Sequence, residues 1–379
     1  MKILHTSDWH LGMTVNGADI TEDQLYFIDQ IKEIVKEQQV DVVMIAGDIF
    51  DRANVSGEVI RIYDDAVTSL CSEIGAKTVV IAGNHDGPER LSQCSRLLAG
   101  AGLYVAGIMD SAVEKVEFED THIYLLPWID TARVRYAFPE QAEEITDTES
   151  AYRVVCDHIR AVMDPSKRNI LTAHAFIVNA ETSVSDRAAE IGFASAVPSD
   201  VFEGFDYVAL GHIHKPQDIT DTIRYSGTPM PYSFGKEETQ EKSVTIIDTD
   251  DMSRQILPLQ LLHQRKTLSG SYEELLKGDI PEEIRKGYLR IELTDRYMGA
   301  ETMMALRQVY PNILEGRGLS FEGDHAKATI TAEELKHASH DPVSIFRSFC
   351  ADMAGMEPDD DQIRLFEEAV RAQTGEELQ

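Results

Sequence analysis

The chain has 379 residues, of which 43% are hydrophobic, and this length allows a large buried core divided over two or three domains. Its 66 acidic residues outnumber its 35 basic ones, and the resulting net charge of −31 argues against general affinity for nucleic acid. No stretch approaches the roughly twenty apolar residues of a membrane helix, and four scattered cysteines favour a reducing cytoplasm over a disulfide framework.

The first predicted element is a short strand, Ile3-Leu4, so we expect no signal peptide in front of it. Asp8 and His10 follow it two positions apart, and in extended backbone such side chains point the same way. The next strand, Val42 to Ala46, is apolar enough to be buried on both faces. A glycine then lets the backbone turn, so that Asp48 projects from the carboxyl end of the strand, where open α/β sheets place their chemistry.

Helices are predicted between these strands. Apolar residues recur at helical spacing from Leu25 to Val35, and the pair Thr21 and Gln24 in front of them is typical of a capping box. A second helix is expected over residues 59–74 and a third over residues 89–99. Alternating strands and helices predict right-handed crossovers and a sheet with helices on its outer faces.

Further strands end in polar side chains along the rest of the domain. Val79 to Ala82 leads into Asn84 and His85, Ile170 to Ala173 leads into His174, and Tyr207 to Leu210 leads into His212 and His214. Between these strands we expect a hairpin-like pair over residues 113–128, a helix over 152–163 and a long excursion facing the site over 176–205. Closing strands over 243–248 and 254–257, a small α+β unit over 266–335 and two short amphipathic helices complete the chain.

Together the strand ends supply nitrogen and oxygen ligands and no sulfur. Seven such ligands are too many for one ion and suit two ions bridged by a carboxylate, and the mixture of imidazole and carboxylate favours Mn, Fe or Zn over Mg or Ca. Two divalent ions about 3.5–4 Å apart can activate water and neutralise charge on a phosphate. The candidate ligands are Asp8, His10, Asp48, Asn84, His174, His212 and His214.

The order of these motifs resembles that of the calcineurin-like metallophosphoesterases: Asp-x-His, Gly-Asp-x-x-Asp, Gly-Asn-His-Asp, His and Gly-His-x-His. Within that superfamily, residues 7–12, 46–51, 209–214 and 225–230 resemble the SbcD family of nuclease subunits. The resemblance covers the whole chain and implies an α/β fold (an α+β sandwich) of stacked sheets flanked by helices. It implies a metallophosphoesterase domain over 1–262, a capping and DNA-binding domain over 263–337, and a C-terminal helix-loop-helix over 338–379.

The resemblance also implies roles for the site residues. Asp48 would bridge two manganese ions, one completed by Asp8, His10 and His214 and the other by Asn84, His174 and His212. His85 would face the leaving-group oxygen as proton donor or charge stabiliser, held by Asp51 in a His–Asp dyad.

The activity implied is that of a two-metal DNA nuclease, a double-strand exonuclease and a single-strand or hairpin endonuclease, in DNA end processing, repair and recombination. The family implies a homodimer joined to an SbcC-type coiled-coil ATPase, which we expect the C-terminal helices to bind. A phosphodiesterase or phosphatase acting on a nucleotide or phosphoprotein is the alternative, and a non-catalytic adaptor would predict a damaged ligand set. Basic residues near the motifs could contact phosphates or be ordinary surface charges: Arg52, Arg90, Arg187, Lys215 and Lys236.

Overall fold

The structure is a computed structural model that describes residues 1–111, 113–186 and 196–319, together with residues 343, 346–347, 358–359 and 362–367. The chain divides into two compact units, Met1–Arg265 and Lys266–Gln379. Most of the predicted C-terminal helix-loop-helix, part of the excursion over 176–205 and the basic residue Arg187 lie outside the described residues.

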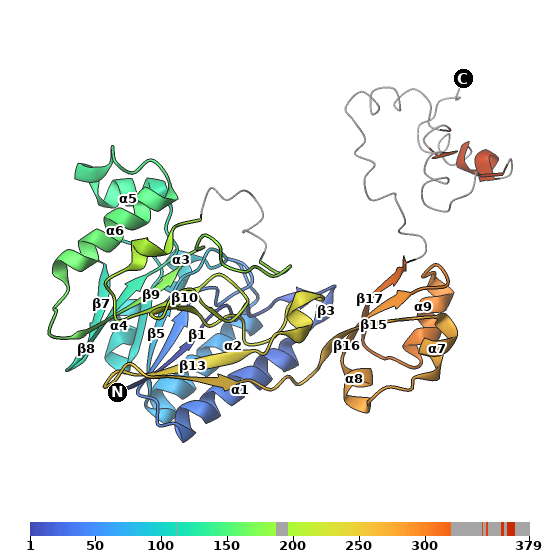
Figure 1. Ribbon diagram of the computed structural model, residues 1–379, viewed down its shortest axis with the longest axis horizontal. Helices are drawn as coiled ribbons and strands as arrows, with labels where there is room; N and C mark the ends of the chain where they lie inside the picture. The colour runs from blue at the N-terminus through green and yellow to red at the C-terminus, as the bar shows by residue number, and fades with distance from the viewer. Residues whose placement is uncertain are drawn as a thin grey trace. The chain divides into compact units, whose positions relative to one another are not determined.

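The first unit contains a six-stranded sheet built largely from the N-terminal half of the chain (Figure 1). Its strand order is β14-β13-β1-β4-β5-β6, in which β1, β4, β5 and β6 are parallel and β13 is antiparallel to both neighbours. The predicted strand at residues 42–46 is confirmed as β4 and is buried along its whole length. The strands are β1 (Lys2–Thr6), β4 (Val42–Ala46), β5 (Lys77–Ile81), β6 (Leu103–Ala106), β13 (Ser243–Asp248) and β14 (Arg254–Pro258).

A second six-stranded sheet has the order β11-β12-β10-β9-β8-β7. Its strands β8, β9, β10 and β12 are parallel, while β7 and β11 pair antiparallel at the two edges. The hairpin predicted over residues 113–128 is confirmed as the β7–β8 pair. The strands are β7 (Glu114–Glu117), β8 (Thr121–Leu126), β9 (Arg168–His174), β10 (Tyr207–Gly211), β11 (Gln217–Asp218) and β12 (Ile223–Tyr225).

The two sheets pack face to face around a shared apolar core. Val42 and Met44 from the first sheet lie in one buried cluster with Ile170 and Tyr207 from the second. Burial of apolar side chains from both sheets keeps the two layers together and holds the carboxyl ends of their central strands at one edge. Helices α1 (Thr21–Glu37) and α2 (Gly57–Thr68) flank the first sheet, and α5 (Thr131–Ala137) and α6 (Thr148–Val162) flank the second (Figure 1).

Two local predictions are wrong. Gln24 does not cap α1, because its side-chain amide donates to the His10 carbonyl (2.9 Å) and its side-chain oxygen accepts from the Gly12 amide (3.1 Å). The buried Gln24 therefore fixes the loop that carries His10. The single helix predicted over 89–99 is divided into α3 (Pro88–Leu91) and α4 (Ser95–Leu98), because Cys94 between them adopts a left-handed φ of 61°.

The second unit contains a small α+β arrangement. Strands β15 (Arg265–Gly270), β16 (Tyr288–Leu293) and β17 (Ile313–Gly318) form a sheet in which β16 and β17 are parallel. Helices α7 (Tyr272–Lys277), α8 (Glu282–Lys286) and α9 (Ala300–Arg307) accompany it, and buried Leu289, Ile291 and Leu306 contribute to its core. Across the described residues of both units, no helix is long and apolar enough to cross a bilayer.

Candidate metal centre

The seven predicted ligands meet at the carboxyl ends of five strands drawn from both sheets. Asp8 and His10 follow β1, Asp48 follows β4 and Asn84 follows β5, while His174 ends β9 and His212 and His214 follow β10. Parallel strands bring such residues to one edge although they are far apart in sequence. All are buried except Asn84, which is partly exposed.

The backbone at this edge is strained. Asp8, His10, Asp48 and His212 all adopt positive φ values, of 53°, 43°, 51° and 103°. Residues other than glycine rarely adopt positive φ values, and such strain persists only where the surrounding structure imposes it. The strain turns these ligands away from the strand direction and into the common centre.

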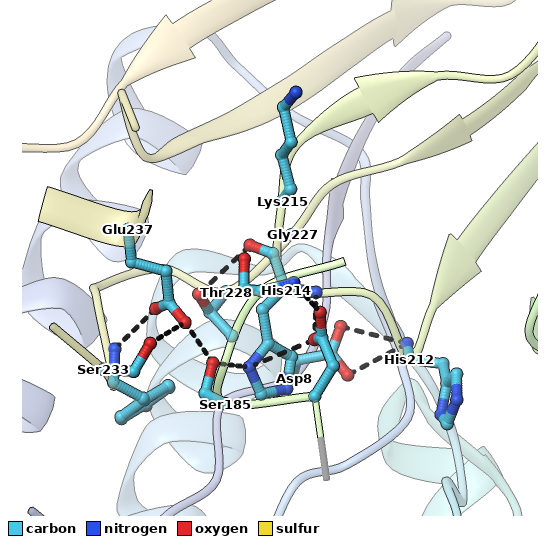
Figure 2. A network of polar contacts seen from close by, with 12 residues as sticks. Asp8, Ser185, His212, His214, Lys215, Gly227, Thr228, Ser233 and Glu237 are labelled. Carbon is cyan, nitrogen blue, oxygen red and sulfur yellow. Dashed lines mark hydrogen bonds and ion pairs between the residues drawn. The ribbon is translucent and has the colours of Figure 1, made fainter. Parts of the chain in front are cut away.

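One group of ligands forms around His10. The ligand atoms of Asp8, His10 and His214 lie within 4.8 Å of one another, and the two imidazole Nε2 atoms are 3.1 Å apart. The His10 Nε2 atom is also 3.7 Å from Oδ2 of Asp48. The Asp8 carboxylate is oriented by the His212 amide, which donates to both of its oxygens at 3.0 and 3.2 Å (Figure 2). This group coincides with the predicted ligands of the first ion.

A second group forms around Asn84. Its side-chain oxygen lies 3.0 Å from Nε2 of His174 and 3.0 Å from Nδ1 of His212. The His174 Nε2 atom is 3.4 Å from Oδ2 of Asp48. The same Asp48 oxygen therefore lies near imidazoles of both groups, as a carboxylate shared by two ions requires.

The hydrogen bonds around His174 test whether these residues fit a metal. Its Nδ1 atom is 2.8 Å from the Ala46 carbonyl, and because a carbonyl can only accept, that nitrogen carries the proton. Its Nε2 atom then faces two further acceptors, the Asn84 amide oxygen and the Asp48 carboxylate, which a proton on Nε2 or a metal ion in its place can satisfy. Converging acceptors of this kind are satisfied by a cation, and imidazole with oxygen ligands suits a divalent transition metal.

Burial controls the protonation of the centre. It raises the pKa of Asp8 to about 8 and lowers the pKa values of His10 and His212 to about 4 and about 3. Burial also lowers the pKa of His174, but the Asp48 carboxylate outweighs it and raises that pKa to about 9. Burial opposes ionisation of Asp48, yet the neighbouring His174 keeps its pKa below the usual value. A metal must therefore displace protons held at neutral pH.

His85 lies beside the first group, with its ring centroid 4.9 Å from that of His10. Its partner differs from the predicted dyad: Nδ1 of His85 is 2.8 Å from the main-chain carbonyl of Asp51, while the Asp51 carboxylate accepts from Arg52 at 2.9 Å. The carbonyl fixes the Nδ1 proton and leaves Nε2 available. The His85 amide also donates to Asp48 Oδ1 at 2.9 Å, which ties His85 to the centre.

Sequence reasoning missed two residues that shape the centre. Asp86 accepts from three amides, those of Ile49, Phe50 and Gly83, at 2.8–3.2 Å, and so joins the loops that carry Asp48 and Asn84. Trp128 stacks on the His212 ring, with centroids 5.2 Å apart and planes 28° apart. The available signals were their positions: Trp128 ends the hairpin predicted over residues 113–128, and Asp86 ends the Gly-Asn-His-Asp motif.

Some of the basic residues near the motifs have acidic partners. Arg52 pairs with Asp51, and Lys215 pairs with Glu181. Both pairs are partly exposed, and pairs of this kind exchange readily with solvent.

The chain was compared with known proteins. The family model for calcineurin-like phosphoesterases matches residues 1–216, and that for the type 5 capsule protein repressor C-terminal domain matches residues 261–354. The SbcD component of the SbcCD nuclease of Staphylococcus epidermidis is 32% identical over 357 residues, which span 93% of each chain.

Two solved structures are more distantly similar. A dimetal phosphatase from Danio rerio is 12% identical, with a TM-score of 0.41, over 65% of this chain and 91% of its own. GAP50 of Plasmodium is 13% identical, with a TM-score of 0.36, over 83% of this chain and 96% of its own. Neither likeness is close enough to bear on function.

Proposed function

The chain belongs to the SbcD family of calcineurin-like phosphoesterases, and we propose that it is the two-metal nuclease component of an SbcCD-type complex. The observation that carries this proposal is the meeting of two ligand groups at one oxygen of Asp48. A similarity that spans both the phosphoesterase domain and the C-terminal region supports it.

We propose that the cofactors are two divalent ions. The mixture of imidazole and carboxylate ligands suits Mn, Fe or Zn, and the resemblance to the SbcD family favours Mn²⁺ among them. Asp48 would bridge them, and the two groups described above would complete their coordination. When bound, such ions supply an activated water and neutralise the charge of the phosphate.

The remaining chemistry belongs to His85. Its ring is fixed through Nδ1 by the Asp51 carbonyl, and it is only partly buried, so Nε2 can reach a substrate. We assign it, in its doubly protonated form, the donation of the Nε2 proton to the leaving-group oxygen as the P–O bond of a phosphodiester breaks, with Asp51 as its support through the main-chain carbonyl.

The proposed substrate is DNA: double-strand ends for exonuclease cleavage, and hairpins or single strands for endonuclease cleavage. A chain with a net charge of −31 repels the phosphate backbone, so a partner must supply much of the cationic surface. An SbcC-type ATPase in the cytoplasm, joined to a homodimer of this chain, would meet that need.

Parallel assays on the purified full chain test this function. The chain is incubated with blunt duplex DNA and with a p-nitrophenyl phosphodiester, with and without Mn²⁺, and with the ATPase added. The Asp48→Asn variant serves as the control for contaminating nuclease. We expect Mn²⁺-dependent cutting of DNA. Turnover of the small ester with no DNA cutting, even with the ATPase, would favour the small-substrate phosphodiesterase that the acidic surface also suits.

A further inference from the structure

His214 is held at three separate points by the surrounding chain. Its main-chain amide donates to Asp186 at 2.9 Å, and its main-chain carbonyl accepts from Lys242 Nζ at 3.0 Å. Its ring Nδ1 lies 2.6 Å from the Ser185 hydroxyl. Of the candidate ligands, His10 offers a contrast, because its Nδ1 has no hydrogen-bond partner among the described residues.

The Ser185 hydroxyl connects His214 to a buried carboxylate, Glu237 (Figure 2). Glu237 accepts from Ser185, from the Ser233 hydroxyl at 2.7 Å and from the Tyr232 amide at 2.8 Å. Its side chain is completely buried, and so is that of Lys242, whose Nζ lies 3.7 Å from Oε2 of Glu237. A carboxylate kept charged in this way accepts hydrogen bonds and donates none.

The direction of these hydrogen bonds fixes the tautomer of His214. A serine hydroxyl has one proton, and Ser185 gives it to Glu237, so its oxygen must accept from Nδ1–H of His214. The Nε2 atom is then unprotonated and faces Nε2 of His10, 3.1 Å away, within the first ligand group.

We propose that Ser185 and Glu237 are positioning residues that hold His214 in its metal-binding tautomer and so set the affinity of the first ion, the one at Asp8, His10 and His214. This inference rests on the proposed two-metal function. We call the two successive hydrogen bonds, from His214 to Ser185 and from Ser185 to Glu237, the relay. The second group has no such relay at His174, whose Nδ1 donates to the Ala46 carbonyl. Partners of metal-bound histidines typically change metal affinity 10- to 100-fold, so loss of the relay should weaken one ion and leave the other.

A merely structural role for Glu237 can be separated from this one. The Glu237–Lys242 ion pair stabilises the segment between β12 and β13. Glu237→Gln would therefore disturb both this ion pair and the hydrogen bond from Ser185. Ser185→Ala removes the contact with His214 and leaves the ion pair and the Ser233 hydrogen bond in place. Ser185→Thr retains the hydroxyl, and the exposed Glu241→Gln is a matched charge control in the same segment.

The test is calorimetric titration of the metal-stripped full chain with Mn²⁺. We expect two bound ions for the native chain, for Ser185→Thr and for Glu241→Gln. In Ser185→Ala and Glu237→Gln, one dissociation constant should rise about 10- to 100-fold while the other changes much less. Unchanged affinities in a folded Ser185→Ala variant would overturn the relay. A native chain that binds fewer than two ions would instead overturn the proposed function.

A second measurement needs no variant to fold. In the metal-free native chain labelled with ¹⁵N-histidine, we expect the His214 ring to show a protonated Nδ1 and an unprotonated Nε2. The opposite tautomer would overturn the relay whatever the calorimetry shows, because Ser185 would then have to donate to His214 and could not bond to Glu237.

Discussion

At the scale of single residues, the rings of His174 and His85 are oriented by the same kind of hydrogen bond. Each ring donates Nδ1–H to a main-chain carbonyl, of Ala46 and of Asp51, at 2.8 Å, so that Nε2 is the nitrogen that can bind a metal or transfer a proton. The surroundings separate their roles: His174 is fully buried against Asp48, whereas His85 is partly exposed. One is therefore suited to hold a cation and the other to meet a substrate.

The His85→Ala variant tests that division. Loss of a general acid typically lowers the rate about 10²- to 10⁴-fold, and we expect a fall of that order in Mn²⁺-dependent DNA hydrolysis. Elemental analysis should still find two ions, because the proposed function does not place His85 among the ligands. The exposed His158→Ala serves as control and should keep full activity. Loss of an ion from His85→Ala would show that the role assigned to it is wrong.

The raised pKa values of two groups in the centre predict that the stability of the metal-free protein depends on pH. Asp8 and His174 have pKa values raised to about 8 and about 9, above their ordinary values of 3.8 and 6.5. Both groups bind their protons more tightly in the folded chain, so the stability that they contribute is complete at low pH and is lost as the pH rises through 8 and 9. The metal-free protein should therefore lose free energy of unfolding between pH 7 and 8.5.

In the proposed function Mn²⁺ takes the place of those protons, so the gain in Tm on adding it should be larger at pH 8.5 than at pH 7. Thermal unfolding at both pH values, with Mn²⁺ and with a chelator, measures the two trends. An equal gain in Tm at both pH values would contradict the assigned pKa shifts.

Several of these residue-scale features were predictable from sequence and others were not. Asp8 and Asp48 lie just beyond apolar strands and His174 ends one, so the local pattern revealed them. The relay was not visible, because Ser185 lies 29 residues from His214 and 52 from Glu237 in segments without a recognisable motif.

At the scale of elements, glycines at the strand ends allow close approach between neighbouring strands of the first sheet, at Gly83, and between the two sheets, at Gly211. A Cβ atom on Gly83 would lie 2.1 Å from Oδ1 of Asp48, and one on Gly211 would lie 1.9 Å from the carbonyl oxygen of Ala46. Because these contacts are with the ligand loop and the backbone, no small adjustment relieves them. Glycine is thus required where strand ends at the centre touch, both within a sheet and between the two sheets.

Gly83→Ala should therefore disturb both stability and the centre. We expect a loss of about 1–3 kcal/mol in the free energy of unfolding, as overpacking usually costs, together with weaker metal binding. Gly100→Ala is the control, since a Cβ there meets nothing within 4 Å, and its stability should change little. Urea unfolding of the metal-free variants measures the difference. Equal stabilities would show that the strand ends are less closely packed than described.

The strands were the most predictable elements, because a run of apolar residues buried on both faces has few alternatives. The helix boundaries were less predictable, since tertiary contacts decided them. Gln24 bonds to the His10 loop instead of capping α1, and Cys94 leaves the helical region although the apolar spacing continues through it.

At the scale of the whole molecule, the proposed function requires other components for the approach to DNA, because the net charge of the chain is −31. The centre supplies acceptors for cations, and the remaining cationic surface must come from a partner. The order of motifs along the chain was enough to identify the family. Which basic residues approach DNA was not predictable, because acidic neighbours such as Glu181 pair with some of them.

Deletion of residues 342–379 tests how the chain is divided between catalysis and assembly. We expect the shortened protein to lose binding to the ATPase, because the two apolar helix faces predicted there need a partner to bury them. It should retain Mn²⁺-dependent nuclease activity, because every candidate ligand lies before residue 215. Co-purification with the tagged ATPase and a nuclease assay give the two results. Retained co-purification would place the ATPase contact elsewhere.

The most direct test of the central claim is the metal content of the active protein with and without Asp48. Elemental analysis of the native chain after removal of excess Mn²⁺ should find two ions per chain, and the Asp48→Asn variant should lose both ions together with nuclease activity. A single ion in fully active native protein, or an Asp48→Asn variant that keeps its activity, would contradict the account.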